Sequence, residues 1–199
     1  MKKKLTGFLA ATFMGLLLLT ACGGEESYVP KPRGYNRIDL PDYAYQLLPD
    51  TFPYSFVYSS HARLSRDTFP SAGRYFVNLY YPEFDGLVQI TYKDLSDPEV
   101  DVERLLTDAF GLTMKHNVKA YDINEKLIQI RNGQVASVIE LSGEVPSQFQ
   151  FFTTDTTNHF FRGALYFNTA LKNDSLAPVI DYIKKDIVEM LNSLEWKYQ

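Results

Sequence analysis

The stretch RYFVNLYYPEFDGLVQITYKD, residues Arg74–Asp94, decides the fold of this chain. Apolar and polar side chains alternate along it, on both sides of a turn that contains Asp85 and Gly86. An alternation with a period of two is the pattern of a strand with one buried face. The stretch therefore predicts two antiparallel strands joined as a hairpin.

Two later stretches repeat this pattern. EKLIQIRNGQVASVIELSG, residues Glu125–Gly143, contains the dipeptide Asn132-Gly133, which accepts a positive φ at both central positions of a tight hairpin turn. SQFQFFTTDTTNHFFRGALYFN, residues Ser147–Asn168, has the polar loop TTDTTN between two apolar halves. Three hairpins in succession predict a sheet that is largely antiparallel.

Two helices are expected beside this sheet. Asp97 is a candidate N-cap, with Pro98 at the first helical position and acidic residues in the first turn. The apolar positions that follow at helical spacing are Val102, Leu105, Leu106, Ala109, Phe110 and Thr113. A second helix starts near Asp174 or Ser175, and its apolar stripe comprises Val179, Ile180, Ile183, Ile187, Met190, Leu191 and Leu194.

The fold class predicted from these elements is a single α+β domain, mostly antiparallel sheet flanked by helices. About 160 residues, 40–199, supply a substantial core. The order of elements, with a last helix that ends in LNSLEW, resembles the fold of the photosystem II protein PsbP and of Mog1. A likeness of fold carries no information on function.

The N-terminus has the pattern of a bacterial lipoprotein signal peptide. Three lysines follow Met1, an apolar run extends over Leu5–Leu19, and LTAC ends at Cys22. We expect cleavage before Cys22 and attachment of diacylglyceryl and palmitate chains to it, which together make membrane anchoring permanent. The alternative is a transmembrane anchor, but the run is shorter than the ~20 apolar residues that span a bilayer. The predicted organisation is a signal peptide at 1–21, a lipidated tether at 22–39 and the domain at 40–199.

Charge and cysteine content exclude several classes of function. The chain has 20 basic and 24 acidic residues; without the three signal-peptide lysines the basic count is 17 and the net charge −7. Such an acidic protein lacks the clustered cations that general nucleic-acid binding requires. Cys22 is the only cysteine, so a lipidated Cys22 leaves no thiol for disulfides, cysteine-bound zinc or thiol catalysis.

Candidate catalytic or metal-binding residues are few. The three histidines, His61, His116 and His159, are far apart in sequence and form no H-E-x-x-H motif. We expect His116 to act as a cation at a helix end. Asp155, Asn158 and His159 share one loop, where such residues usually serve turn geometry. The acidic stretch DLSDPEVDVE lacks the spacing and the glycine of a calcium loop and is better explained as a helix N-terminus. We therefore expect a protein that is not an enzyme and has no cofactor or metal.

The stretch YVPKPRGYNRIDLP, residues 28–41, is basic and rich in proline within an acidic protein. Together with FPYSFVYS, which follows it, the stretch resembles the gliding-motility lipoprotein family GldD, and the resemblance covers nearly the whole mature chain. The residues that carry it are Pro30, Pro32, Gly34, Tyr35, Arg37 and the ending IDLP. The stretch YSSHARL at Tyr58–Leu64 matches no motif of that family.

The resemblance implies a cell-envelope component of gliding motility and type IX protein secretion, with no catalytic residues to carry over. We expect Lys31, Arg33, Tyr35 and Arg37 to bind partner proteins, because a stiff segment with two arginines and flanking aromatics loses little entropy on docking and arginine forms bidentate bonds with carboxylates. Two other interpretations of the stretch remain open: docking onto the domain itself, and contact with anionic lipid head groups.

Two other functions also remain open: a glycan- or peptidoglycan-binding module that uses exposed aromatic side chains, and a hydrolase whose site the sequence does not reveal. Gly23, in place of an aspartate after Cys22, favours the outer membrane over the inner membrane. We expect the domain to face the periplasm.

Overall fold

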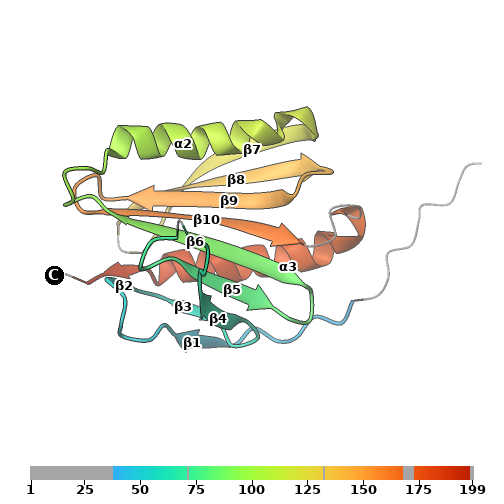
Figure 1. Ribbon diagram of the computed structural model, residues 1–199. Helices are drawn as coiled ribbons and strands as arrows, with labels where there is room; N and C mark the ends of the chain where they lie inside the picture. The colour runs from blue at the N-terminus through green and yellow to red at the C-terminus, as the bar shows by residue number, and fades with distance from the viewer. Residues whose placement is uncertain (1–37, 71, 132, 168–172, 198–199) are drawn as a thin grey trace, which may run out of the picture. The chain divides into compact units, whose positions relative to one another are not determined.

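A computed structural model of the chain describes residues 38–197, apart from 71, 132 and 168–172. These residues belong to one compact unit built around a seven-stranded antiparallel sheet, whose strands lie in the order β4-β5-β6-β10-β9-β8-β7 (Figure 1). The strands are β4 (Arg63–Arg66), β5 (Val77–Tyr81), β6 (Gly86–Asp94), β7 (Ala120–Gln129), β8 (Val135–Gly143), β9 (Ser147–Thr154) and β10 (His159–Phe167). The predicted α+β domain is confirmed.

Two short pairings form separate two-stranded sheets beside the large one. β1 (Tyr45–Leu47) pairs with β3 (Val57–Ser59), and β2 (Tyr54–Ser55) pairs with β11 (Glu195–Trp196). The second pairing brings the start and the end of the domain side by side, and the exposed ion pair between Lys197 and Asp50 lies next to it. Neither pairing was expected from the sequence, because strands of two or three residues are too short to show a period.

All three predicted hairpins are present. β5 pairs with β6, β7 with β8, and β9 with β10, each antiparallel. The expected turn residues also adopt the left-handed backbone conformation, with φ of 50° at Asp85 and 85° at Gly133. At the centre of the sheet β10 also pairs with β6, a long-range contact that local patterns do not specify.

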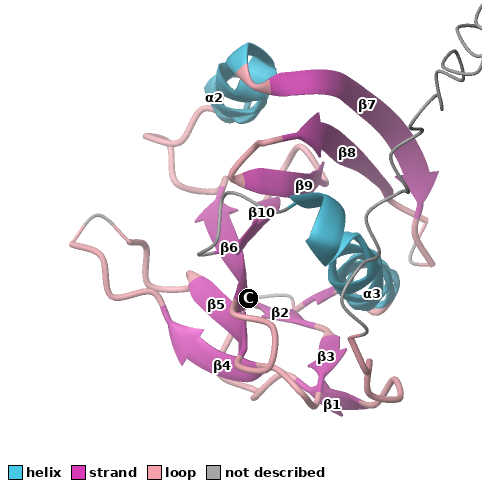
Figure 2. Ribbon diagram, turned by 90° about the vertical axis from the view of Figure 1, so that its right-hand side faces the viewer, coloured by secondary structure: helices cyan, strands magenta, loops and turns pink. Residues whose placement is uncertain are grey.

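The helix α3 (Asn173–Asn192) covers one face of the sheet, as Figure 2 shows. Its stripe is buried as predicted, except that Ile180 is only partly buried. A second helix, α2 (Val102–Met114), lies on the opposite side, where Thr113 Oγ1 donates to Gln150 Oε1 over 3.1 Å. A short 3₁₀ helix, η1 (Lys115–Val118), leads from α2 into β7. Within the described part of the chain, no helix has both the length and the apolar composition needed to cross a membrane.

The start of α2 differs from the prediction. Asp101, rather than Asp97, is the N-cap, and its side chain accepts a hydrogen bond from the Glu103 N–H. Asp97 closes a separate turn, in which its carboxylate accepts from Glu99 N and its carbonyl from Val100 N. Because both aspartates are followed two positions later by a glutamate, the local pattern does not distinguish them. The expected burial of Phe110 is also wrong, since 57% of this residue is exposed.

The core is dominated by aromatic rings, and Phe161 in β10 lies at its centre with no exposed surface. Its ring lies 5.2 Å from Tyr54, 6.0 Å from Phe56, 6.1 Å from Phe151 and 6.2 Å from Trp196, measured between ring centroids. The ring of Phe151 occupies the space above Gly163, where an added Cβ would stand 2.2 Å from its Cζ. Glycine at position 163 is therefore required for this packing.

We predict that Phe161→Ala lowers the free energy of unfolding by ~3–5 kcal/mol, since the change removes a fully buried ring and leaves a cavity. Urea unfolding followed by circular dichroism measures this loss. The matched control is Phe110→Ala on the exposed side of α2, for which we expect a change within about 0.5 kcal/mol. Equal effects of the two substitutions would contradict the central position of Phe161.

Candidate functional site

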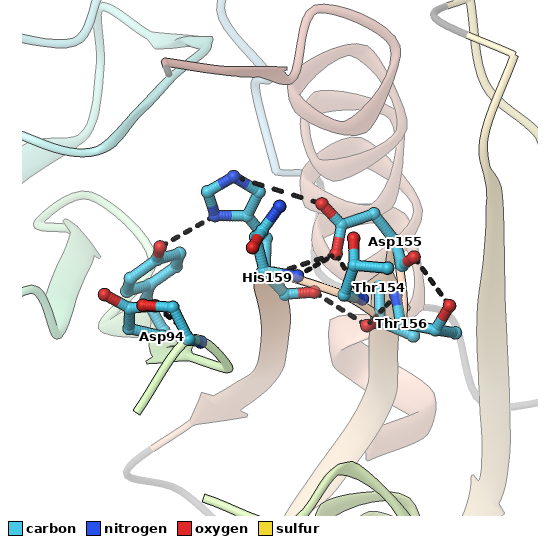
Figure 3. Close-up of polar contacts among 9 residues, drawn as sticks. Asp94, Thr154, Asp155, Thr156 and His159 are labelled. Carbon is cyan, nitrogen blue, oxygen red and sulfur yellow. Dashed lines mark hydrogen bonds and ion pairs between the residues drawn. The ribbon is translucent and has the colours of Figure 1, made fainter. Parts of the chain in front are cut away.

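The tip of the β9–β10 hairpin holds the most connected polar cluster among the described residues (Figure 3). Asp155 Oδ1 accepts three backbone N–H groups, from Thr157 at 3.0 Å, Asn158 at 2.8 Å and His159 at 2.8 Å. Thr154 Oγ1 donates to the His159 carbonyl over 2.7 Å. The predicted role of Asp155 in turn geometry is confirmed, and Asn158 contributes its backbone rather than its side chain.

The imidazole of His159 is held on three sides. Its Nδ1 lies 2.8 Å from the hydroxyl of Tyr92, and its Nε2 lies 3.9 Å from Asp155 Oδ2. Trp196 stacks on the ring with centroids 4.7 Å apart. The ring therefore connects the hairpin tip to β6 and to the C-terminal strand β11.

Burial lowers the pKa of His159, although the nearby carboxylates of Asp155 and Asp94 oppose this shift. Burial alone would raise the pKa of Asp155, but its three backbone donors and the His159 charge bring it below the ordinary value. Burial thus disfavours the charged form of the imidazole, while the backbone donors favour the ionised form of the carboxylate. The imidazole of His159 and the carboxylate of Asp155 point their polar atoms at partners within the described part of the protein, where the ring of His159 contacts Tyr92, Asp155 and Trp196. The arrangement stabilises the hairpin tip.

The other two histidines lie apart from this cluster. His61 Nε2 lies 3.0 Å from the Asp42 carbonyl and so attaches the first described residues to the domain. His116 lies in η1, directly after α2. Burial lowers its pKa, and the positive charge of Arg162 lowers it further. His116 does lie at this helix end, as predicted, and its lowered pKa opposes the charged form that the predicted role requires.

A buried carboxylate in α3 was not predicted. Asp186 has only 2% of its surface exposed, and its Oδ2 accepts from the hydroxyl of Tyr81 over 3.1 Å. Burial raises the pKa of Asp186, while this hydrogen bond opposes the shift. The sequence contains a signal for this burial, because Asp186 lies within the apolar stripe of the helix. Its neighbours on that stripe are Ile183, Ile187 and Met190. It lies inside the core and offers no surface to a ligand.

The site residues predicted from the sequence, Cys22, Lys31, Arg33, Tyr35 and Arg37, lie outside the described residues, as do the expected signal peptide and most of the tether. Their roles remain predictions, and so do the expected boundaries at 21/22 and 39/40. The described chain begins at Ile38, which is partly buried against the core.

The residues that follow Ile38 form a surface of exposed apolar side chains, which we call the 40–47 segment. Its exposed members are Leu40, Tyr43, Tyr45 and Leu47, and 67% of Leu47 is accessible. Tyr43 stacks on Tyr182 of α3 with ring centroids 4.7 Å apart and on Tyr45 at 6.5 Å. Lys185 Nζ stands 5.9 Å from the Tyr43 ring centroid. The segment therefore presents rigid aromatic rings next to a cation.

A cavity of about 290 Å³ lies between α3 and the strands β7 and β8. Its lining combines aromatic, amide and charged side chains: Tyr121, Glu140, Leu141, Ser142, Gly143, Gln148, Ala177, Ile180, Asp181 and Lys184. Lys184 Nζ lies 2.9 Å from Glu140 Oε2 and 3.5 Å from Asp181 Oδ1. The charges of the cavity are therefore largely paired with one another.

We predict that acid destabilises the wild-type protein more than the variant His159→Gln. The folded pKa of His159 lies below its ordinary value of 6.5, so the unfolded chain binds more protons as the pH falls through 6.5, and stability is lost. Melting temperatures between pH 8 and pH 5 measure the difference. His61→Gln, on an exposed loop, is the matched control. Parallel curves for wild type and His159→Gln would contradict the lowered pKa of the ring.

Comparison with known proteins identifies a family. The family model for the gliding motility lipoprotein GldD matches residues 25–196, whereas no curated protein sequence matches the chain. Among solved structures, the chain is similar to PsbP (CyanoP) from the cyanobacterium Synechocystis sp. PCC 6803, at 12% sequence identity and a TM-score of 0.45 over 81% of this chain and 97% of that chain. At that TM-score the likeness transfers no function. Because the family model spans most of its length, the chain belongs to the gliding motility lipoprotein GldD family.

Proposed function

We propose that this lipoprotein binds partner proteins of the gliding motility and type IX secretion machinery and has no catalytic activity of its own. The observation that carries the proposal is the exposed 40–47 segment, which directly continues the basic stretch at residues 28–37. Membership of a gliding motility family supports the process. The two stretches together form one binding element that combines cations with apolar and aromatic groups.

The chemistry of this element favours a partner with acidic and apolar surface. Arginine forms bidentate hydrogen bonds with carboxylates, and prolines that stiffen residues 30–41 reduce the entropy lost on docking. Tyrosine rings supply contact area at low conformational cost, and Tyr43 is already fixed by its stack on Tyr182. The described part of the element, residues 40–47, is therefore preorganised for a protein surface.

The anchoring part of the proposal rests on Cys22. Lipids on Cys22 hold the chain at the outer membrane, with the domain on the periplasmic side. The family description as a lipoprotein supports an anchored envelope protein, and Gly23 supports the choice of membrane.

A second candidate function is glycan binding, which the cavity beside α3 favours. Tyr121 provides an exposed ring at its edge, while Gln148 and Asp181 provide planar polar groups. Rings and planar polar groups are suited to sugar faces and hydroxyls. Retention of the protein on isolated cell wall, lost in Tyr121→Ala, would support this function over partner binding.

We predict that Cys22→Ala abolishes membrane fractionation and motility while the domain stays folded. The thiol is the only one in the chain, so no other element depends on it. Pelleting of membranes after carbonate and salt washing, followed by immunoblotting, measures the effect. A variant that still pellets would show that the hydrophobic segment is an uncleaved anchor.

We also predict that the double change Arg33→Ala and Arg37→Ala reduces recovery of partner proteins from membranes, because it removes both bidentate donors. Melting temperature and membrane fraction should stay unchanged. Leu47→Ser tests the apolar half of the element in the same way. Arg104→Ala with Lys119→Ala, on exposed positions near α2, controls for the loss of two cations. A melting temperature that falls together with recovery would assign the stretch to the fold.

A further inference from the structure

The outer edge of the sheet at β7 is open in the described part of the chain. β7 is the last strand of the sheet and pairs only with β8 there (Figure 2). The strand extends over Ala120–Gln129, so it presents a long row of backbone N–H and C=O groups. Such an edge is a template for pairing with another strand.

Apolar side chains surround this edge. Exposed fractions reach 92% for Val118, 77% for Tyr121 and 73% for Leu127. These residues lie in β7 or at its start and have little contact with the core. Exposed apolar groups in such a cluster mark a surface that another protein covers.

The geometry of antiparallel pairing restricts how two copies of β7 can meet. Successive residues of a strand direct their backbone N–H and C=O groups to opposite edges. Two residues that lie directly opposite each other in an antiparallel pair must therefore both direct these groups toward the partner strand or both direct them away from it. When a twofold axis relates two identical strands, residues at equal distances on either side of the axis are paired. The condition is met only if the axis lies at one residue, which then faces the same residue of the second copy, and not midway between two consecutive residues. Because β7 spans Ala120–Gln129, axes through Asn124 and Glu125 give the longest ladders.

Charge selects between these two registers. An axis through Glu125 places two glutamates directly opposite each other, which is destabilising. An axis through Asn124 places Asp122 opposite Lys126 of the second copy, twice in the dimer. The same register brings Leu127 next to Tyr121 of the second copy, although a β-bulge between Ala120 and Asp122 displaces the strand there.

The side chains involved are available for this pairing. Asp122, Asn124 and Lys126 are all exposed and alternate along the strand, so they share one face of the sheet. Lys126 Nζ lies 3.8 Å from Glu140 Oε1, but Glu140 has a closer partner in Lys184 at 2.9 Å. Lys126 can therefore turn toward the second copy while Glu140 keeps its closer ion pair with Lys184.

We propose that β7 pairs with β7 of a second copy of this chain, antiparallel and with the twofold axis at Asn124, so that the two sheets become one. Two Asp122–Lys126 pairs fix the register, and the exposed apolar side chains around the edge are covered. This dimer surface is separate from the binding element at residues 28–47, and it does not depend on the proposed function.

Site-directed disulfide formation in the full-length protein in membranes tests the dimer. A cysteine at the axis faces the same cysteine of the second copy. Asn124→Cys should therefore form a cross-linked dimer on oxidation, which is seen on a non-reducing gel. Asp122→Cys and Lys126→Cys should each stay monomeric alone and should cross-link when they are coexpressed. The chain without an added cysteine shows the background from Cys22.

Charge reversal supplies a second measurement. Lys126→Asp turns both ion pairs into like-charge pairs, so the cross-linked fraction of Asn124→Cys should fall roughly tenfold. Adding Asp122→Lys reverses the pairs and should restore cross-linking. Unchanged circular dichroism of the variants confirms that the sheet is intact. The absence of a cross-link in Asn124→Cys, cross-linking through Glu125→Cys instead, or a failure of the charge swap to restore it would overturn the proposal.

Discussion

The structure depends on the burial of Phe161 in the middle of β10. Its ring contacts rings from β2, β9 and β11 and from the residue before β3, so elements from both ends of the domain meet at one side chain. The space for these rings exists because residue 163 on the same strand is glycine, which lets Phe151 lie across the backbone. Burial of aromatic rings contributes both area and specific geometry, and here it closes the domain without a disulfide.

The packing of aromatic rings around Phe161 also fixes the position of the polar cluster at the tip of the β9–β10 hairpin. Trp196, held against Phe161, stacks in turn on His159, and His159 joins Tyr92 and Asp155 at the hairpin tip. The polar cluster is thus an extension of the aromatic core to the end of the sheet. Its internal hydrogen bonds give Asp155 the role in turn geometry that was expected from the sequence.

Local patterns were sufficient for most of the fold. The three hairpins, the stripe of α3 and the turn at Gly133 follow from alternation, helical spacing and backbone preference, each of which depends on neighbouring residues. The pairing of β10 with β6 and of β2 with β11 depends on residues far apart in sequence, and no local pattern encodes it. The N-cap at Asp101 was missed because the local pattern fits Asp97 equally well, and the lowered pKa of His116 depends on burial that only the tertiary fold sets.

The position of Ile38 limits how the basic stretch works. Ile38 rests on the core and the Asp42 carbonyl contacts His61, so the domain fixes one end of the stretch, and the lipid proposed on Cys22 would hold the other end at the membrane. The intervening chain can extend over roughly 50 Å, whereas attraction to lipid head groups fades beyond a Debye length of about 8 Å. Under the proposed lipidation, a fully extended tether would carry Lys31, Arg33 and Arg37 beyond the reach of the bilayer. The domain is acidic and would oppose approach to an anionic surface, which favours the proposal of a protein partner with carboxylates over lipid contact.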